Sequence, residues 1–169
     1  MELTKPLHDE WTHLLNQSVS RIRHCVGQLS QEQIWWQPGP DLNSIGILIR
    51  HLAGNLNQWV VDGVPQRENA RDRAAEFESD ERGSPAELLD NLSLVVDAAN
   101  CVIETLTDGD LEQARGIQGF DVTVLGAVMH SVPHFVGHTH QIVLLTRMQL
   151  GAAYRFHWDP NAERGKVPL

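Results

Sequence analysis

Three histidines recur at four-residue intervals in the segment His130-Ser-Val-Pro-His134-Phe-Val-Gly-His138. On an α-helix, residues four apart lie on one face with Cβ atoms about 5–6 Å apart, so two imidazoles can bind one divalent metal ion. With 9 histidines in 169 residues, random placement gives about 0.4 pairs at this spacing. Two consecutive pairs in one segment therefore favour a metal site over chance.

Helical geometry limits which histidines can share one ion. With His130 at 0° on a helical wheel, His134 lies at about 40° and His138 at about 80°, whereas His140 lies on the other side at about 280°. A rise of about 1.5 Å per residue separates His130 from His138 by more than about 10 Å, so at most one adjacent pair binds directly. The third ligand must come from another helix. His51 is the candidate because it flanks the apolar arc of its helix, and the wheel leaves open which adjacent pair joins it.

The expected ligand set determines the expected chemistry. Three neutral imidazoles and an open position are typical of catalytic zinc sites, whereas structural zinc is normally closed by four ligands. Imidazole also suits nickel, iron and copper, and we expect zinc first and nickel second. Ligating imidazoles usually donate their second N–H group to a neighbour, which makes Gln141 and Asn55 candidate orienting groups and leaves His130 as a candidate acid or base. The alternative is that the histidines are packed or surface residues without a metal.

Four amphipathic segments could position these side chains. In each segment apolar residues recur three and four apart, and no segment alternates with period two over the length of a strand. This pattern predicts an all-α fold, an antiparallel four-helix bundle. The first helix is expected over about residues 5–28; the second starts at Asn43 or Ser44 and ends at Asp62-Gly-Val-Pro65; the third starts at Ser84 and ends near Thr107-Asp-Gly109; the fourth starts around Asp121 and ends at Gly151.

Two other segments lack this pattern. Residues 64–83 hold ten charged residues of mixed sign with Phe77 as the one large apolar side chain, which predicts a long solvated connection between the second and third helices. Connections of this length are unusual in compact domains, and a lid, a dimer contact and a mobile linker are the alternatives. Residues 152–169 are expected to form an irregular tail docked on a single domain that spans residues 1–169. Pro133 inside the fourth helix predicts a bend or a local widening near His134.

Composition excludes several classes of protein. A formal net charge of −9 without a basic run argues against nucleic-acid binding, for which a basic patch supplies most of the affinity. Cys25 and Cys101 form no Cys-x-x-Cys motif, which favours a reducing compartment. The first ten residues are polar and no stretch of eighteen apolar residues follows, so we expect a cytoplasmic protein with neither a secretory signal nor a membrane span.

Two motifs resemble those of a known family. Ser44-Ile-Gly-Ile-Leu-Ile-Arg-His51-Leu-Ala-Gly-Asn55 and His130-Ser-Val-Pro-His134-Phe-Val-Gly-His138-Thr-His-Gln141-Ile142 resemble the helix-two and helix-four motifs of the DinB superfamily, which includes YfiT-like proteins. The resemblance covers nearly the whole chain in element order. It implies a four-helix bundle in which His51, His134 and His138 hold one divalent metal ion. The chain reads His138-Thr-His140-Gln141 where the family usually has His-Arg-Gly-Gln, so the packing after the last ligand is expected to differ.

The resemblance also implies a range of activities. Members of the superfamily include thiol-dependent transferases, maleylpyruvate isomerases and hydrolases, many are dimers, and many have no assigned activity. A metal ion with an open position lowers the pKa of bound water toward about 7 or binds a thiol as thiolate. We therefore expect a homodimeric, metal-dependent enzyme that acts on a small molecule as a hydrolase or as a transferase using a low-molecular-weight thiol. The alternative is a dimeric binding module whose metal site is structural or vestigial.

Overall fold

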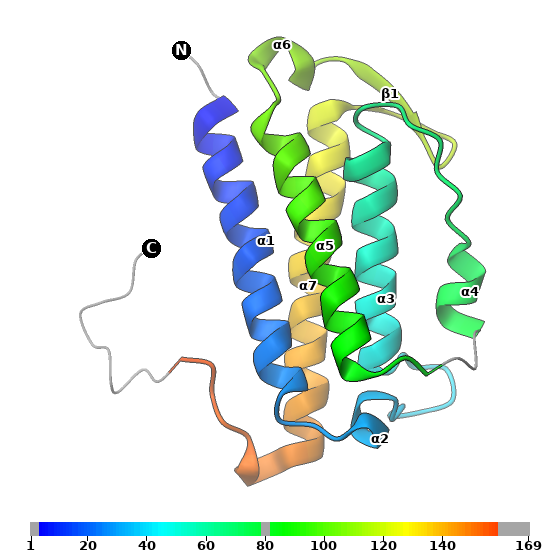
Figure 1. Ribbon diagram of the computed structural model, residues 1–169, viewed down its shortest axis with the longest axis vertical. Coiled ribbons are helices and arrows are strands. Elements are labelled where there is room, and N and C mark those ends of the chain that lie inside the picture. Colours follow the sequence, from blue (N-terminus) through cyan, green and yellow to red (C-terminus); the bar gives the residue numbers. More distant parts are fainter. Residues whose placement is uncertain (1–3, 79–81, 159–169) are drawn as a thin grey trace.

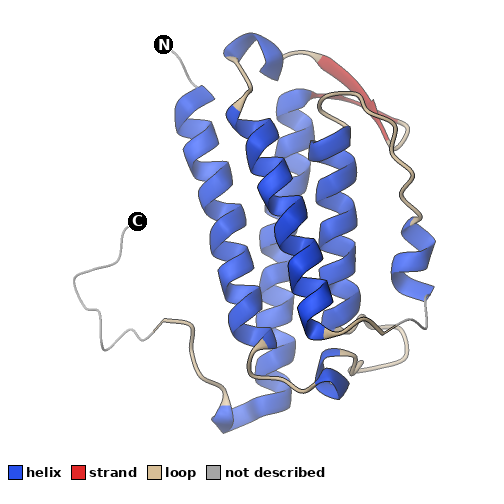
Figure 2. Ribbon diagram, viewed as in Figure 1, coloured by secondary structure: helices blue, strands red, loops and turns tan. Residues whose placement is uncertain are grey.

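The computed structural model describes residues 4–78 and 82–158. Four long helices lie side by side (Figure 1), and most of the described chain is helical (Figure 2). The predicted all-α four-helix bundle is confirmed. The elements in chain order are α1 (Thr4–Val26), α2 (Gln31–Ile34), α3 (Ile45–Leu56) with its π-helical continuation η1 (Asn57–Asp62), α4 (Arg73–Glu78), α5 (Pro85–Glu104), α6 (Asp108–Leu111), β1 (Ala114–Ile117), β2 (Phe120–Thr123), α7 (Val124–Leu150) and η2 (Gly151–Ala153).

The order of the helices around the bundle differs from their order in the sequence. Helix α1 packs against α7 and α5, and α3 packs against α5 and α7. Figure 1 shows that α3 and α5 begin at the same end of the bundle, so they run parallel, whereas α7 runs opposite to α3. The connection from η1 to α5 must therefore travel back along the length of the bundle, which explains why it is long.

Each long helix turns its apolar side chains toward one shared core. The spacing of three and four noted in the sequence places these side chains on one face, and burying them drives the helices together. Side chains without measurable exposure come from all four helices: Leu15 and Ile22, Leu52 and Leu56, Leu92 and Ile103, and Val132 and Ile142.

Polar caps fix where the helices begin. Ser84 accepts a hydrogen bond from the Glu87 backbone amide while the Glu87 carboxylate accepts one from the Ser84 amide, and this capping box begins α5 where the sequence predicts. Of the two candidate caps for α3, Ser44 is the one used, and its side chain accepts from the Ile47 amide. Helix α7 begins later than predicted: its cap is Thr123 rather than a residue around Asp121.

That shift comes from a β-hairpin that the sequence analysis did not predict. Strands β1 and β2 pair antiparallel, with Asp121 opposite Gly116. Gln118 and Gly119 both have positive φ, at 52° and 80°, as a two-residue hairpin turn of the I′ type requires. The hairpin was not predicted because four-residue strands, of which only Ile117 is buried, are too short to show a period-two pattern.

The connection between η1 and α5 also differs from the prediction. Residues 73–78 form helix α4, which packs against α3, so this part of the segment is not a solvated loop. Residues 79–81 of the predicted connection lie outside the described residues. Of the bend or local widening predicted near Pro133, the widening is not found, because α7 continues as an α-helix through Pro133. Widened, π-helical turns occur in η1.

The described part of the C-terminal segment lies against α1. His24 Nε2 is 2.6 Å from the carbonyl oxygen of Arg155, and the Gln28 side chain donates to the same oxygen over 3.1 Å. The Ser20 hydroxyl lies 2.9 Å from His157 Nε2. Residues 159–169 of the predicted tail lie outside the described residues. No described helix has the length and apolar character needed to span a lipid bilayer.

Candidate metal centre

Histidines from two helices meet where α3 packs against α7. His51 on α3 is buried, and His134 and His138 on α7 are half-buried. Each of the three offers one ring nitrogen, and these nitrogens all lie within 4.8 Å of one another. His51 Nε2 is 2.9 Å from His134 Nε2. Two imidazole nitrogens at this distance must share a hydrogen or a metal ion, because two bare lone pairs would repel each other.

The ring geometry brings His134 and His138, rather than His130 and His134, next to His51. His134 and His138 stand nearly perpendicular, with centroids 4.3 Å apart, and both also meet the His51 ring edge to face. His130 instead stacks on Trp59, with centroids 3.9 Å apart. Trp59 therefore keeps the His130 ring outside the group of three, although His130 precedes His134 by a single helical turn.

Polar neighbours occupy the second ring nitrogen of two of the histidines. His138 Nδ1 lies 2.7 Å from Gln141 Oε1, as expected for an orienting group on the same helix. His51 Nδ1 lies 3.0 Å from Glu76 Oε2 on α4. If these Nδ1 atoms carry the hydrogens, the Nε2 lone pairs of both rings point to the shared centre, which is the arrangement that ligating imidazoles need.

Asn55 does not orient a histidine. Its Oδ1 accepts a hydrogen bond of 2.9 Å from the Ser131 hydroxyl, and both residues are buried. This bond links α3 to α7 inside the core. Asn55 therefore helps to hold together the two helices that carry the three histidines rather than acting on a ring directly.

Two residues beside His51, Arg71 and Glu76, were not predicted from the sequence. Glu76 forms an ion pair with Arg71, in which Arg71 Nε donates to Oε1 over 2.6 Å and Nη2 donates to Oε2 over 2.7 Å. The side chains are 5% and 11% exposed, which is unusual for charged residues and requires that they be paired. Both lie in the segment predicted to be a solvated loop. A sequence signal existed in Gly54, a glycine inside a helix one turn after His51, because such a glycine often permits a close approach.

Burial sets the protonation of this cluster. Burial, reinforced by the charges of His138, His51, His130 and Arg71, lowers the pKa of His134 to about 4. Burial likewise lowers the pKa of His138, against an opposing hydrogen bond from Gln141. Burial alone would raise the pKa of Glu76, but the hydrogen bonds from Arg71 and His51 lower it by more. At neutral pH the site thus combines neutral imidazoles on α7 with an ionised carboxylate behind His51.

The lowered pKa of His134 predicts an acid-sensitive fold in the absence of metal. In the unfolded chain a histidine has a pKa of about 6.5, whereas the folded His134 has a pKa of about 4. Between these two pH values the unfolded state therefore binds more protons than the folded state. The free energy of unfolding is therefore greatest above the pKa of the unfolded chain, about 6.5, and decreases as pH falls from about 6.5 to about 4. Urea unfolding in chelator at roughly pH 7 and 5 should show a larger loss of free energy of unfolding for wild type than for His134→Asn. Equal losses in both proteins would contradict the assignment.

The chain matches the model of one known protein family. The model of a family described as a protein of unknown function, DUF1572, matches residues 5–158. The chain belongs to the DUF1572 family. The match spans α1 to the segment after η2, and therefore includes all three histidines and α4. No curated protein matches the chain.

Solved structures share its fold. YfiT from Bacillus subtilis, described as a probable metal-dependent hydrolase with an unusual four-helix bundle topology, is 18% identical with a TM-score of 0.69, over 84% of this chain and 87% of that chain. A conserved protein from Enterococcus faecalis is 16% identical with a TM-score of 0.69, over 89% and 99%. A DinB-like protein from Bacillus cereus is 15% identical with a TM-score of 0.65, over 83% and 91%. The predicted resemblance to the DinB superfamily is confirmed at the level of the fold.

Proposed function

We propose that the protein is a metal-dependent enzyme in which His51, His134 and His138 hold one divalent ion. The observation that carries the proposal is the convergence of three imidazole nitrogens from α3 and α7 within 4.8 Å of one another. In a tetrahedral site with zinc–nitrogen distances of about 2.0–2.1 Å, ligand nitrogens lie about 3.3 Å apart, so small ring movements suffice. The lowered pKa values of His134 and His138 support the proposal, since a ligating imidazole must be neutral.

The composition of the cluster favours catalysis over a purely structural metal. Within residues 4–78 and 82–158, the group that could hold an ion comprises these three histidines and no fourth histidine, cysteine or carboxylate. Glu76, the nearest acid to His51, is occupied by Arg71. Structural zinc sites are usually closed by four protein ligands, whereas catalytic sites keep one position open. The alternative is a binding module with a structural or vestigial metal. A structural metal would usually need a fourth protein ligand, which this group does not supply.

We propose zinc as the ion, with nickel as the second choice, since imidazole suits both metals. Bound in this way, a divalent ion with an open position supplies a nucleophile at neutral pH by lowering the pKa of a water molecule or a thiol. The side chains contribute orientation: Gln141 holds the His138 ring and Glu76 holds the His51 ring. His130 stacks at the edge of the site, where its exposed ring is a candidate proton carrier for the reaction.

Hydrolysis of a small molecule is the reaction that we favour, with thiol transfer as the second candidate. The description of YfiT as a probable metal-dependent hydrolase supports the first. Thiol transfer would use the same open position and adds a low-molecular-weight thiol as co-substrate. Assembly as a homodimer stays a prediction.

The activity should depend on the ion and on its ligands. Protein loaded with zinc or nickel is assayed against a panel of small esters and amides, and against an electrophile with and without a low-molecular-weight thiol. We expect turnover that a chelator abolishes, that re-added ion restores, and that His134→Ala lowers by a factor of at least about a hundred. Turnover without thiol identifies hydrolysis, and turnover that requires thiol identifies transfer.

His140→Ala is the matched control for this assay, because His140 lies on the same helix but is exposed and close to Arg21 rather than to the site. It should keep wild-type turnover. A chelator-resistant activity, or equal losses in His134→Ala and His140→Ala, would count against the proposed site.

A further inference from the structure

We propose that Arg71 and Glu76 form a positioning pair that fixes His51 in its metal-binding tautomer, and that this contact couples metal binding to the docking of α4. The inference rests on the proposed function, because it concerns one ligand of the proposed metal site. Neither residue touches the shared centre of the three histidines. They act through His51 and are therefore positioning residues.

The contacts around His51 Nδ1 indicate where its hydrogen lies. Glu76 Oε2 is 3.0 Å away and, as a carboxylate oxygen, can only accept. Arg71 Nη2 is 3.3 Å away and can only donate, but it already donates to the same Oε2 over 2.7 Å. A hydrogen on Nδ1 therefore satisfies the closest contact, and a lone pair there would face the carboxylate. The hydrogen on Nδ1 leaves the Nε2 lone pair free for the ion.

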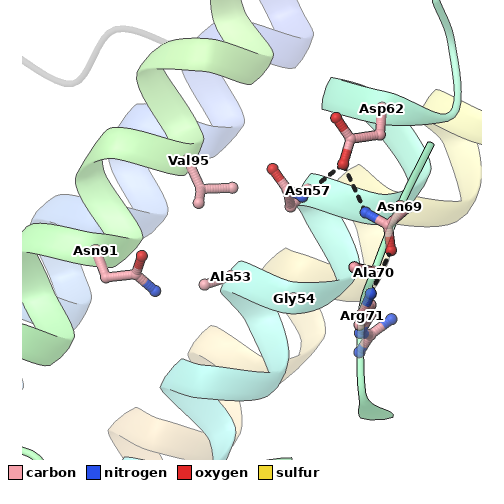
Figure 3. A pocket seen from close by; sticks show the side chains of 9 residues that line it. All are labelled: Ala53, Gly54, Asn57, Asp62, Asn69, Ala70, Arg71, Asn91 and Val95. Atoms are coloured by element: carbon pink, nitrogen blue, oxygen red, sulfur yellow. Dashed lines mark hydrogen bonds between the residues drawn. The ribbon is translucent and has the colours of Figure 1, made fainter. Parts of the chain in front are cut away.

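Arg71 is held in place by hydrogen bonds from several sides. Asp62 Oδ2 accepts from Asn57 Nδ2 over 2.8 Å and from Asn69 Nδ2 over 2.6 Å. Asn69 Oδ1 then accepts from the Arg71 backbone amide over 3.0 Å, and Figure 3 shows this chain of bonds beside α3. Gln58 Oε1 accepts from Arg71 Nη1 over 2.9 Å. The turns of η1 thus anchor the arginine that anchors Glu76.

Gly54 makes room for this contact on the surface of α3. A Cβ atom on Gly54 would overlap Glu76 Oε1 and would lie 2.9 Å from Arg71 Nε. The residue belongs to a helix interior, where glycine is less favourable than alanine by about 1 kcal/mol. The close approach of Arg71 and Glu76 explains why glycine occupies position 54.

Gly54 and Arg71 border a cleft of about 440 Å³ between α3 and α5, and Figure 3 draws both among the residues that line it. The cleft contains none of the three histidines. The pair contacts His51 at Nδ1, on the other side of the ring from the Nε2 atom that faces His134.

The contact ties the site to a distant part of the chain. Glu76 lies on α4, and the neighbouring Phe77 ring packs against His51 with centroids 5.1 Å apart. If docking of α4 raises the metal affinity of His51, then binding of the ion must favour the docking of α4 by the same factor. Helix α4, with six residues and no fully buried side chain, has little other reason to stay docked.

Zinc affinity tests the inference. Glu76→Gln keeps the size of the side chain but removes its charge, and Gly54→Ala leaves Glu76 intact while displacing it. We expect each to weaken zinc binding by about 10- to 100-fold, measured by competition with a chromophoric chelator. The matched controls are Glu78→Gln, which is exposed on the same helix, and Gly137→Ala, which lies beside His138 with open space around its Cβ. Both controls should bind zinc within about twofold of wild type.

Two further measurements distinguish positioning from a general structural role. Nitrogen NMR of the imidazoles should find His51 protonated at Nδ1 in wild type and a mixture of tautomers in Glu76→Gln. Amide hydrogen exchange across residues 73–78 should slow on addition of zinc to wild type and stay unchanged in Glu76→Gln. A wild-type His51 protonated at Nε2 in the metal-free protein, or equal zinc affinities in wild type and both variants, would overturn the inference.

The outcomes separate this inference from the proposed function. A wild type that binds no zinc removes the metal site, while the tautomer of His51 still reports on Arg71 and Glu76. A wild type that binds zinc as tightly as Glu76→Gln keeps the metal site and removes the positioning pair.

Discussion

Purified protein is expected to bind one divalent ion per chain, and His51→Ala or His134→Ala is expected to lower its zinc affinity by at least about a thousandfold. Each substitution removes one of the three imidazoles whose nitrogens meet within 4.8 Å. Two imidazoles without a third hold zinc far more weakly, because the three act together on a preformed centre. Elemental analysis gives the stoichiometry, and chelator competition gives the affinity.

The histidines on α7 provide their own controls. His140→Ala removes an exposed imidazole from the same helix and should leave zinc affinity unchanged. His130→Ala removes a ring that stacks on Trp59 and should have a smaller effect than either ligand substitution. Circular dichroism at the assay temperature confirms that each variant is folded. Retention of stoichiometric, tight zinc in both His51→Ala and His134→Ala would eliminate the proposed centre.

The largest effect on stability is expected from the core, and two leucines of α5 isolate it. Leu92 has no measurable exposure, whereas Leu94, two residues later on the same helix, is 70% exposed. Leu92→Ala should lower the free energy of unfolding by about 2–5 kcal/mol, because it removes buried methyl groups and leaves a cavity. Leu94→Ala should change it by no more than about 0.5 kcal/mol.

Denaturant unfolding of the metal-free proteins measures this difference, since bound metal would add its own stabilisation. Neither leucine belongs to the candidate metal site, so both variants should retain zinc binding at low denaturant. Equal losses of stability in the two variants would mean that α5 does not pack with the face described above.

The helices and two of the three proposed ligands follow from local sequence. Amphipathic spacing and side-chain caps such as Ser84 act within one or two helical turns, so the chain specifies them before any distant contact forms. The four-residue spacing of His134 and His138 likewise fixes their proximity through helix geometry alone. His51 could be selected as the third candidate because it is a lone imidazole beside the apolar arc of its helix.

Other features depended on partners that no local pattern reveals. The spacing of His130 and His134 equals that of His134 and His138, and only the stacking of Trp59 on His130 separates the two pairs. The hairpin escaped prediction because its strands are four residues long. Its sequence signal was the Gln118-Gly119 turn.

The charged segment between η1 and α5 shows most clearly what could not be predicted from the sequence. Arg71 and Glu76 have the residue types of a solvated face. They lie 20 and 25 residues after His51, respectively, and their contact with it depends on α4 lying against α3. By itself the sequence determined the four long helices, the core faces and the histidine spacing, because hydrogen bonds and apolar periodicity within a helix are local. The tertiary structure decided which imidazoles converge and which carboxylate supports them, because those contacts arise only when distant helices pack.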